Sequence, residues 1–455
     1  MRGEDVRNLF ETIFPTDDIM ESCRRLGALK RERVMDPVLL VRSMVMAGGS
    51  SECGRLAGIL HDYTNRGGVV GARSGFYQRF NKGLLAVMKE LSNRASEYVA
   101  AMPKHLPGIL AGPSDWRVVD ATTVKVPDGL QSSYPGCGDY GALKVHKEYS
   151  LGVENLIDYS ITPARDHDAP QLKIDDSRRG TGLLVDLGYV SHDLFRQCEV
   201  HDVRLVVRLK KGWNFRLDAG KTGRQFQTWE LPPEAVDAVE AGFDAPFVVP
   251  PSGIVDVDVT LGDGGGPPVR LVAMDSRRGR HVLLTNLPRE TYAPEEVGML
   301  YRLRWNIELD NKLSKQGCRL DDITTGKKIA ADILVHASMI ATMLANAIVH
   351  LQHLSEGAVG EKAVRFKHPP VHPINIWKAV DRASMDIDHH LRNPDDTDGY
   401  WSRLAGIFRR IGADPNWKSQ PSALDRVKGR TARGQAWRCR RRRPVHEVET
   451  DDGLK

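Results

Sequence analysis

The first hundred residues follow the hydrophobic pattern of helices. Between Val6 and Ala101, apolar residues recur at intervals of three and four, as they do along one buried face of a helix. Glycine and serine interrupt this pattern at residues 48–51 and 67–68, so several short helices are predicted. An ordinary helical bundle and a small DNA-binding module would both give such a pattern.

After a proline-containing linker at residues 103–113, the pattern changes to that of strands. Three neighbouring strands, followed by helices and strands in alternation, favour a mixed α/β sheet. The predicted strands cover residues 116–126, 143–151, 154–161, 183–186 and 203–209, and the predicted helices cover residues 169–178 and 192–197. A turn-rich stretch with strand-like runs, at about residues 210–290, is interpreted as a β-rich insertion.

Helical patterns return after the insertion. Long helices are predicted over residues 294–315 and 330–353, and the last hundred residues continue as helices with proline-rich joints. The second long helix is apolar, but polar residues interrupt it, so a packed helix explains it better than a membrane span. We expect a helical region at residues 1–110, an α/β domain at 111–325 and a helical region at 326–455.

Composition places the chain among globular proteins. Apolar residues make up 41% of the 455 residues and charged residues 27%, which excludes a wholly disordered or fibrous protein. The net charge of +5 is too weak to indicate a nucleic-acid partner by itself. The six cysteines form no Cys-x-x-Cys pair and the N-terminus shows no signal peptide, so a location in a reducing cytoplasm is expected.

The chain ends in a run of positive charge. No acid interrupts the basic residues Arg426, Lys428, Arg430, Arg433, Arg438, Arg440, Arg441, Arg442 and Arg443. Because like charges at this density repel one another, the segment is interpreted as a solvated basic tail. Alternatively, it contacts DNA phosphates without sequence preference, with an affinity that depends on salt.

Two carboxylates occupy unusual positions in the predicted sheet. Asp120 lies inside an otherwise apolar strand, where an unpaired charge is costly, so a cation or a metal is expected beside it. Asp186 follows a second buried strand. The carboxyl ends of strands are where α/β sheets generally bind ligands, which favours a site, whereas a cap on the following turn is the alternative role for each acid.

A third acid, Glu308, lies on the helix predicted over residues 294–315. At 3.6 residues per turn, one face of this helix carries Tyr301, Arg304, Glu308 and Lys315. One interpretation is a solvated helix on which Arg304 and Glu308 form an ion pair four residues apart.

A second interpretation comes from the spacing Tyr-x2-Arg-x3-Glu-x6-Lys, which resembles the signature of IS4-type transposases. Four further segments resemble that family in the same order, at residues 119–123, 167–168, 185–189 and 283–287. The resemblance covers residues 116–315. One departure concerns His281, which stands nearest the place where hairpin-forming relatives carry a tryptophan, so the route of cleavage stays open.

The resemblance implies an RNase H-like catalytic domain with a metal-binding triad, made of Asp120, Asp186 and Glu308. Carboxylate oxygens suit Mg²⁺, and Mn²⁺ is expected to substitute for it. Two such ions would activate the attacking oxygen and stabilise the leaving one. Tyr301, Arg304 and Lys315 are implied to contact the DNA of the transposon end.

The implied activity is that of a DNA transposase, which cleaves the ends of an insertion sequence and joins the 3′-OH to target DNA. Its partners would be double-stranded DNA, as terminal inverted repeats and target, and a second copy of the chain in a homodimer. The N-terminal region would bind the DNA ends, and the protein would act at the bacterial nucleoid, without a membrane.

Two other functions fit part of this pattern. An inactive or domesticated relative would bind DNA without cleaving it, and a nick that depends on metal would distinguish the two. An RNase H-like nuclease or resolvase would cut DNA without joining strands, which a strand-transfer assay tests. Trp213 and Trp305 are predicted to lie in the core rather than to stack on bases.

Overall fold

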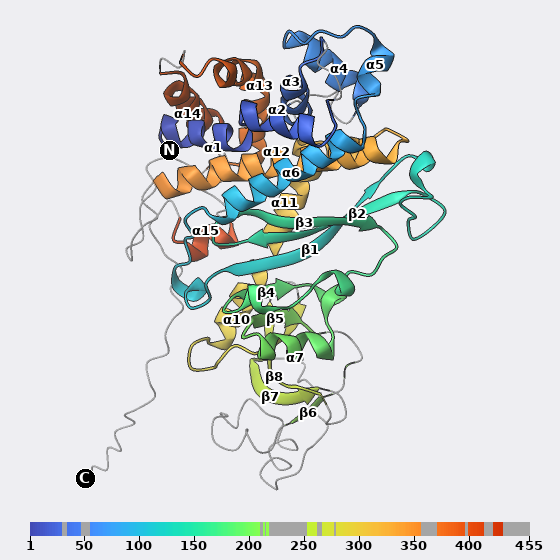
Figure 1. The fold of residues 1–455 in the computed structure, drawn as a ribbon. Helices are drawn as coiled ribbons and strands as arrows, with labels where there is room; N and C mark the ends of the chain where they lie inside the picture. The colour runs from blue at the N-terminus through green and yellow to red at the C-terminus, as the bar shows by residue number, and fades with distance from the viewer. Residues whose placement is uncertain are drawn as a thin grey trace, which may run out of the picture.

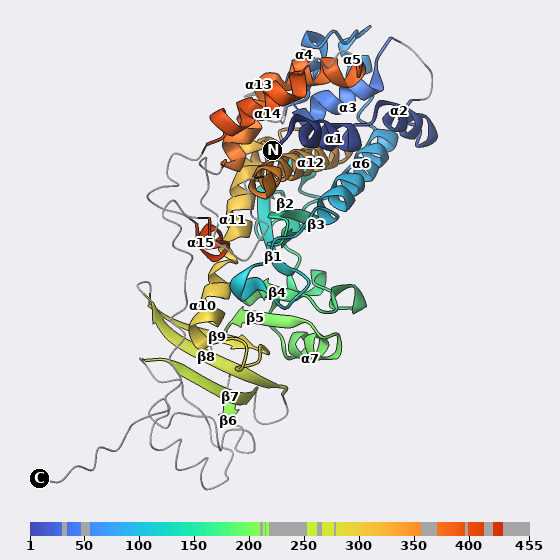
Figure 2. The same ribbon diagram turned by 90° about the vertical axis from the view of Figure 1, so that its left-hand side faces the viewer.

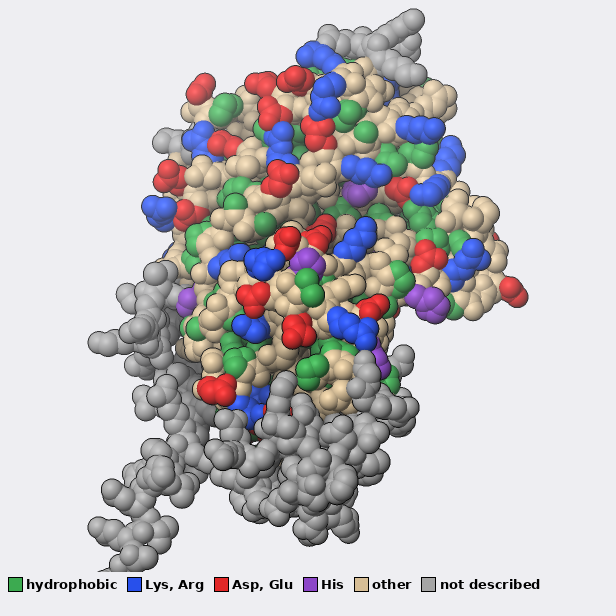
Figure 3. All heavy atoms as spheres, turned by 60° about the horizontal axis from the view of Figure 1, so that its bottom comes forward, with side chains coloured by type: hydrophobic (Ala, Val, Ile, Leu, Met, Phe, Trp, Pro, Cys, Tyr) green, Lys and Arg blue, Asp and Glu red, His purple; other side chains and the backbone are tan. Residues whose placement is uncertain are grey.

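The structure is a computed structural model in which helices gather at one end and a sheet at the other (Figure 1). It describes residues 1–29, 34–46, 55–209, 213, 215–217, 253–261, 266–276, 279–355, 371–395, 399–413 and 422–430. Charged side chains of both signs are interspersed over the face that Figure 3 shows, in keeping with the small net charge of +5.

The described residues form a nine-stranded sheet with the strand order β3-β2-β1-β4-β5-β9-β8-β7-β6. Its strands are β1 (Trp116–Lys125), β2 (Ala142–Ser150), β3 (Asn155–Pro163), β4 (Gly182–Val185), β5 (Arg204–Arg208), β6 (Phe215–Leu217), β7 (Val255–Leu261), β8 (Pro268–Ser276) and β9 (Gly279–Thr285). The first three strands pair antiparallel, whereas β1, β4 and β5 pair in parallel. The predicted α/β fold with an RNase H-like domain is confirmed, and strands of the β-rich insertion continue the same sheet through β9.

Apolar side chains cover both faces of the central strands because they alternate along each strand. Val119 packs with Phe195 of α7 (His192–Val200) on one face. On the other face, Val118 packs with Leu300 of α10 (Pro294–Arg302) and Ile307 of α11 (Trp305–Lys312). Figure 2 shows α10 and α11 along one side of the sheet and α7 on the other.

Helices from both ends of the chain form one lobe. They are α1 (Gly3–Ile13), α2 (Thr16–Arg25), α3 (Pro37–Met46), α4 (Leu56–Asn65), α5 (Arg73–Tyr77), α6 (Lys82–Ala100), α12 (Lys328–Ser355), α13 (Pro373–Arg392) and α14 (Tyr400–Ile411). Arg42 of α3 pairs with Asp388 of α13 at 3.3 Å. Arg409 of α14 donates to the carbonyl of Met1 at 3.0 Å. The two terminal helical regions that the sequence predicts therefore share one core.

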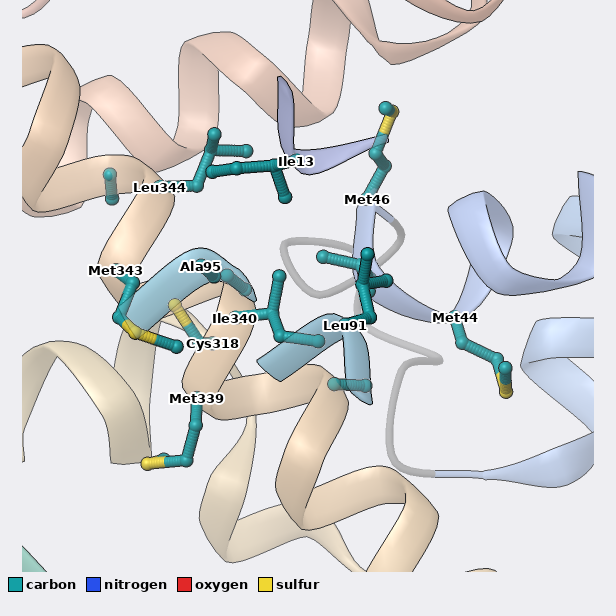
Figure 4. Packing of buried hydrophobic residues seen from close by; sticks show 14 of the residues in the cluster. Ile13, Met44, Met46, Leu91, Ala95, Cys318, Met339, Ile340, Met343 and Leu344 are labelled. Carbon is teal, nitrogen blue, oxygen red and sulfur yellow. The ribbon is translucent and has the colours of Figure 1, made fainter. Parts of the chain in front are cut away.

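The central helix of this lobe is α12, in which every residue from Ala330 to His350 is buried. Figure 4 shows Ile340 of α12 close to Leu91 of α6, and Leu344 of α12 close to Ile13 of α1, within one apolar cluster. Among the described residues, α12 is the one helix long and apolar enough to cross a membrane, and its apolar window is entirely buried inside the protein. This burial agrees with the packed helix predicted there.

The helix predicted over residues 169–178 is wrong. Two short 3₁₀-helices stand in its place, η4 (Ala169–Gln171) and η5 (Asp176–Arg178). The Asp175 carboxylate accepts a hydrogen bond from the backbone amide of Ser177 at 3.0 Å. Such a local side-chain bond competes with a continuous helix, and it explains the short turns.

The C-terminal basic run does not form one solvated tail. Lys428 and Arg430 are buried, and both donate to Glu154, at 2.9 Å from the Lys428 Nζ and at 2.7 Å from one Arg430 nitrogen. The predicted tail is therefore wrong for these two residues, because a buried carboxylate pairs with them. Arg426 is exposed on α15 (Ala423–Val427), and the rest of the run lies outside the described residues.

Candidate active site

Asp120 and Asp186 lie at neighbouring positions on parallel strands. β1 and β4 pair in register up to Val119 and Val185, so the two aspartates take the next position on each chain. Asp186 keeps an extended backbone after β4 ends. Because side chains alternate along a strand, both carboxylates belong to the face that α10 and α11 cover.

Neither aspartate caps a helix or a turn. The Asp186 side chain makes no capping hydrogen bond to η6 (Leu187–Tyr189), the 3₁₀-helix that follows it. Asp120 lies within β1, and its Oδ2 accepts a hydrogen bond of 3.4 Å from the Asn311 side chain of α11. The geometry therefore does not support the alternative considered from the sequence, in which each aspartate caps the turn that follows it.

The Asp120 carboxylate is electrostatically coupled to two other acids. Burial raises the pKa of Asp120 to about 6, and the negative charges of Asp186 and Glu308 act in the same direction, against the positive charge of Arg304. The two other carboxylates must lie near Asp120 to act on its pKa in this way. Such an environment favours a bound cation.

The signature residues lie on two helices and a π-helical turn, so the single helix predicted over residues 294–315 is wrong. Between α10 and α11, the backbone amides of Leu303 and Arg304 bond to carbonyls three residues earlier, at 2.9 and 3.1 Å. The Asn306 side chain also donates to the Leu303 carbonyl at 2.7 Å. These bonds tighten the backbone and separate the two helices.

Three signature residues contact one another at this break. Arg304 donates to Glu308 Oε1 at 2.6 Å, and its guanidinium lies 5.9 Å from the centre of the Tyr301 ring. Burial lowers the pKa of Arg304, but Tyr301, Asp186 and Glu308 outweigh that effect and raise it. The ion pair predicted between residues 304 and 308 is present, and it lies beside the aspartates rather than on an isolated helix.

Lys315 reaches the sheet through a different set of contacts. It lies in the π-helical turn η8 (Leu313–Gly317), and its Nζ donates to the carbonyl of Thr123 at 2.7 Å. The same Nζ lies 3.7 Å from Asp321 Oδ1. Thr123 follows Asp120 on β1, so the turn returns the fourth signature residue to the strand that carries the first acid.

The donor set suits a hard divalent cation, since all three predicted ligands are carboxylates. Among the residues that the structure describes, no three His, Cys, Asp or Glu side chains are gathered closely enough to share one metal ion. Glu308 is bonded to Arg304 in this conformation. A metal ion shared by the three acids would draw Glu308 toward Asp120 and Asp186 and loosen its contact with Arg304.

A buried polar cluster lies near these acids, and the sequence analysis did not predict it. Lys147 of β2 donates to Asp310 Oδ2 at 2.8 Å and to Ser314 Oγ at 2.5 Å, and Asn346 of α12 donates to Asp310 Oδ1 at 2.7 Å. One signal was present, because Asp310 lies three residues after the buried Ile307 on the inward side of its helix.

The two tryptophans differ from each other. Trp213 packs against the apolar cluster beside α7, as predicted. Trp305 is 54% exposed, so its predicted position in the core is wrong. It begins α11 immediately after the backbone break. His281, the residue nearest the place where the resemblance puts the tryptophan of hairpin-forming relatives, is half-buried near the start of β9.

Comparison with known proteins gives one matching family, the transposase DDE domain, over residues 112–344. The transposase of insertion sequence element IS421 from Escherichia coli is 24% identical over 375 residues, which cover 73% of this chain and 91% of the relative. The transposase of IS231F from Bacillus thuringiensis subsp. israelensis is 23% identical over 330 residues, 64% of this chain and 68% of the relative. A cryo-EM structure of the piggyBac transposase synaptic complex with hairpin DNA aligns with a TM-score of 0.45 at 11% identity, over 90% of this chain and 85% of that chain.

Proposed function

The chain belongs to the DDE transposase family, with an IS4-type signature, and from this premise we propose that it cleaves the ends of an insertion sequence and joins the freed 3′-OH to target DNA. The observation that carries the proposal is the register that sets Asp120 beside Asp186, on the face covered by the helix of Glu308. Enzymes of this family use a divalent metal ion, and we assign Mg²⁺ to that role here, with Mn²⁺ as a substitute.

Asp120, Asp186 and Glu308 would hold the metal. When bound, it supplies an activated attacking oxygen and stabilises the leaving 3′-oxygen. Asn311 orients the Asp120 carboxylate through its side-chain amide. Arg304 would change partner, because the guanidinium that holds Glu308 would become available for a phosphate oxygen if that carboxylate held a metal ion.

The DNA strand would pass along the side of the sheet that carries these acids. Tyr301 and Arg304 contact it beside α10, and Lys315 contacts it beside β1. The substrate is double-stranded DNA, as the terminal inverted repeats and later the target. Two copies of the chain would act together in the synaptic complex, and the helices of residues 1–110 would contribute to end binding.

The triad is tested with Glu308→Gln, Asp120→Asn and Asp186→Asn on a DNA substrate that carries the inverted repeats flanking the gene. Each variant should lose Mg²⁺-dependent cleavage and keep end binding, because removing a carboxylate removes a ligand for metal but no contact to phosphate. Glu295→Gln, an exposed glutamate in the first turn of α10, is the matched control and should cleave normally. If Glu308→Gln cleaves at the wild-type rate, Glu308 is not a ligand of the metal and the proposed triad is wrong.

Arg304→Ala distinguishes the signature from a simple surface ion pair. If Arg304 and Glu308 only stabilise α11, both variants should lose a few tenths of a kcal/mol of stability and keep catalysis. The proposal instead expects Arg304→Ala to weaken end binding and Glu308→Gln to spare it. A protein that nicks the ends but fails to join them to target DNA would be a nuclease or resolvase.

A further inference from the structure

A buried ion pair joins the sheet to α11 close to Glu308, and we propose that it positions the Glu308 carboxylate relative to Asp120. The pair consists of Lys147 on β2 and Asp310 on α11, with 2.8 Å between Nζ and Oδ2. Neither residue belongs to the transposase signature. The inference rests on the proposed function, because it concerns how the third acid is held for metal binding.

Lys147 occupies a particular place in the sheet. It is the register partner of Asp120 in the antiparallel pairing of β1 with β2, so the two side chains belong to the same face. The Lys147 ammonium nevertheless bonds to Asp310 and to Ser314 Oγ. The residue opposite the first acid therefore holds the helix that carries the third.

Asp310 fixes α11 in two directions at once. Its Oδ2 faces β2 through Lys147, and its Oδ1 accepts from Asn346 of α12 at 2.7 Å. Ser314 closes the cluster by donating to the Asp310 carbonyl at 2.9 Å. Residues two apart on a helix differ by about 200° in direction and about 3 Å in height, so holding Asp310 sets both the rotation and the height of Glu308.

Apolar packing alone fixes the position of α11 on the sheet only weakly. Ile307 and Asp310 are its buried residues, whereas Trp305 and Leu309 are 54% and 45% exposed. Apolar contact is non-directional, and it leaves a short helix free to shift along the sheet. A buried pair with defined hydrogen bonds is directional, so Lys147 and Asp310 constrain the placement of Glu308 more strongly than the longer contact of 3.4 Å between Asn311 and Asp120 does.

The test replaces the pair with apolar residues of similar size, Lys147→Met together with Asp310→Leu. Removing both charges avoids an unpaired buried ion, so the melting temperature should fall only by the cost of the Asn346 amide that loses its acceptor, and the variant should stay folded. Mn²⁺ binding to the DNA-free protein, followed by electron paramagnetic resonance, should weaken by about 10-fold to 100-fold, the usual cost of losing a group that orients a metal ligand. A folded double variant with wild-type Mn²⁺ affinity overturns the proposal.

The matched control is another buried pair of opposite charges in the same sheet. Arg270 and Asp256 are 2.8 Å apart and 4% and 10% exposed, on strands that carry none of the three acids. Arg270→Met with Asp256→Leu should leave Mn²⁺ affinity unchanged. An equal loss of affinity in both double variants would mean that any buried pair has this effect, and it would also overturn the proposal.

Lys147→Arg keeps the test decisive if the double variant does not fold. It preserves the charge, but the longer, planar guanidinium cannot reproduce the position of the ammonium, so Asp310 must move. Mn²⁺ affinity should fall severalfold in this variant, and an unchanged affinity contradicts the inference. Glu308→Gln is measured beside it: if that variant binds Mn²⁺ as the wild type does, the proposed function fails, whereas a loss confined to Glu308→Gln defeats the positioning role alone.

Discussion

Two helices that follow each other in the chain, α11 and α12, are held in opposite ways. α12 is buried from Ala330 to His350 and packs through apolar side chains of several other helices. α11 buries Ile307 and Asp310 and exposes Trp305. Apolar burial supplies stability with little directional preference, whereas the Asp310 contacts fix direction. The helix that carries a proposed ligand is thus the one held by polar contacts.

The largest effect should come from shortening the chain beside α11. Leu424 of α15 packs in the same apolar cluster as Ile307, and Glu154 holds Lys428 and Arg430. A chain ending at Asp425 leaves the Glu154 carboxylate buried without those partners, which should cost about 3–5 kcal/mol of unfolding free energy. Urea unfolding measures this loss.

A chain ending at Arg430 is the control, and it should unfold at the same urea concentration as the full chain. Although burial raises the pKa of Glu154, Arg430 and Lys428 hold it well below its usual range, so their contribution is lost only as pH falls through that lowered pKa. If the two shortened chains were equally stable at pH 7, the ion pairs of Glu154 with Lys428 and Arg430 would not stabilise the fold, and the prediction would be wrong. The salt dependence of DNA affinity in the chain ending at Arg430 separately tests the remaining basic residues.

The next effect belongs to α12. Ile340→Ala removes a fully buried side chain and should lower the unfolding free energy by about 3 kcal/mol, because a cavity remains in a packed core. Cleavage per folded molecule should stay at the wild-type level. Ile340→Val, expected to cost about 1 kcal/mol, tests whether the loss scales with the atoms removed.

Acid should destabilise α12 through His336. Burial lowers the pKa of this histidine to about 4 from 6.5. The unfolded chain then binds more protons between these values, so unfolding free energy falls as pH drops below 6.5, by about 2 kcal/mol at pH 5 from this group. Because burial also lowers the pKa of His350 on the same helix to about 4, His336→Gln should reduce, without abolishing, the decline in thermal stability between pH 7 and pH 5. A decline of unchanged slope would show that other groups cause it.

The smallest effect is expected on the outer side of α11. Leu309→Ala removes a side chain that is 45% exposed and should change the unfolding free energy by no more than about 0.5 kcal/mol. A loss as large as that of Ile340→Ala would contradict the contrast between the two helices. Differential scanning calorimetry of both variants makes the comparison directly.

The sequence predicted the regular parts of the fold closely. The strand predicted at residues 116–126 is β1 (Trp116–Lys125), and the helix predicted at 330–353 is α12 (Lys328–Ser355). Long apolar patterns of one period leave few alternatives. The helix predicted over 294–315 failed because its break depends on the Asn306 side chain bonding to the Leu303 carbonyl, which no periodicity reveals.

The sequence predicted the acids of the candidate site, but it did not predict the buried ion pairs around them. Asp120 and Asp186 stood out because acids are rare in buried strands, and Glu308 stood out through the family signature. Lys147 and Lys428 did not stand out, since a lysine in a strand or a basic run is usually exposed. Their burial depends on Asp310 and Glu154, which are distant in the chain, and only the tertiary structure brings these partners together.

The contact between Met1 and Arg409 has a consequence for synthesis of the protein on the ribosome. Because synthesis runs from the N-terminus, α1 is made long before α14. The contact between Met1 and Arg409 can form only after residue 409 of the 455 has been made. Contacts so distant in sequence form slowly, and the N-terminal helices meanwhile expose apolar surface. We therefore expect nascent chains that stop before α14 to be captured by chaperones or degraded, so that a fragment without α14 does not accumulate as a folded competitor of the full protein.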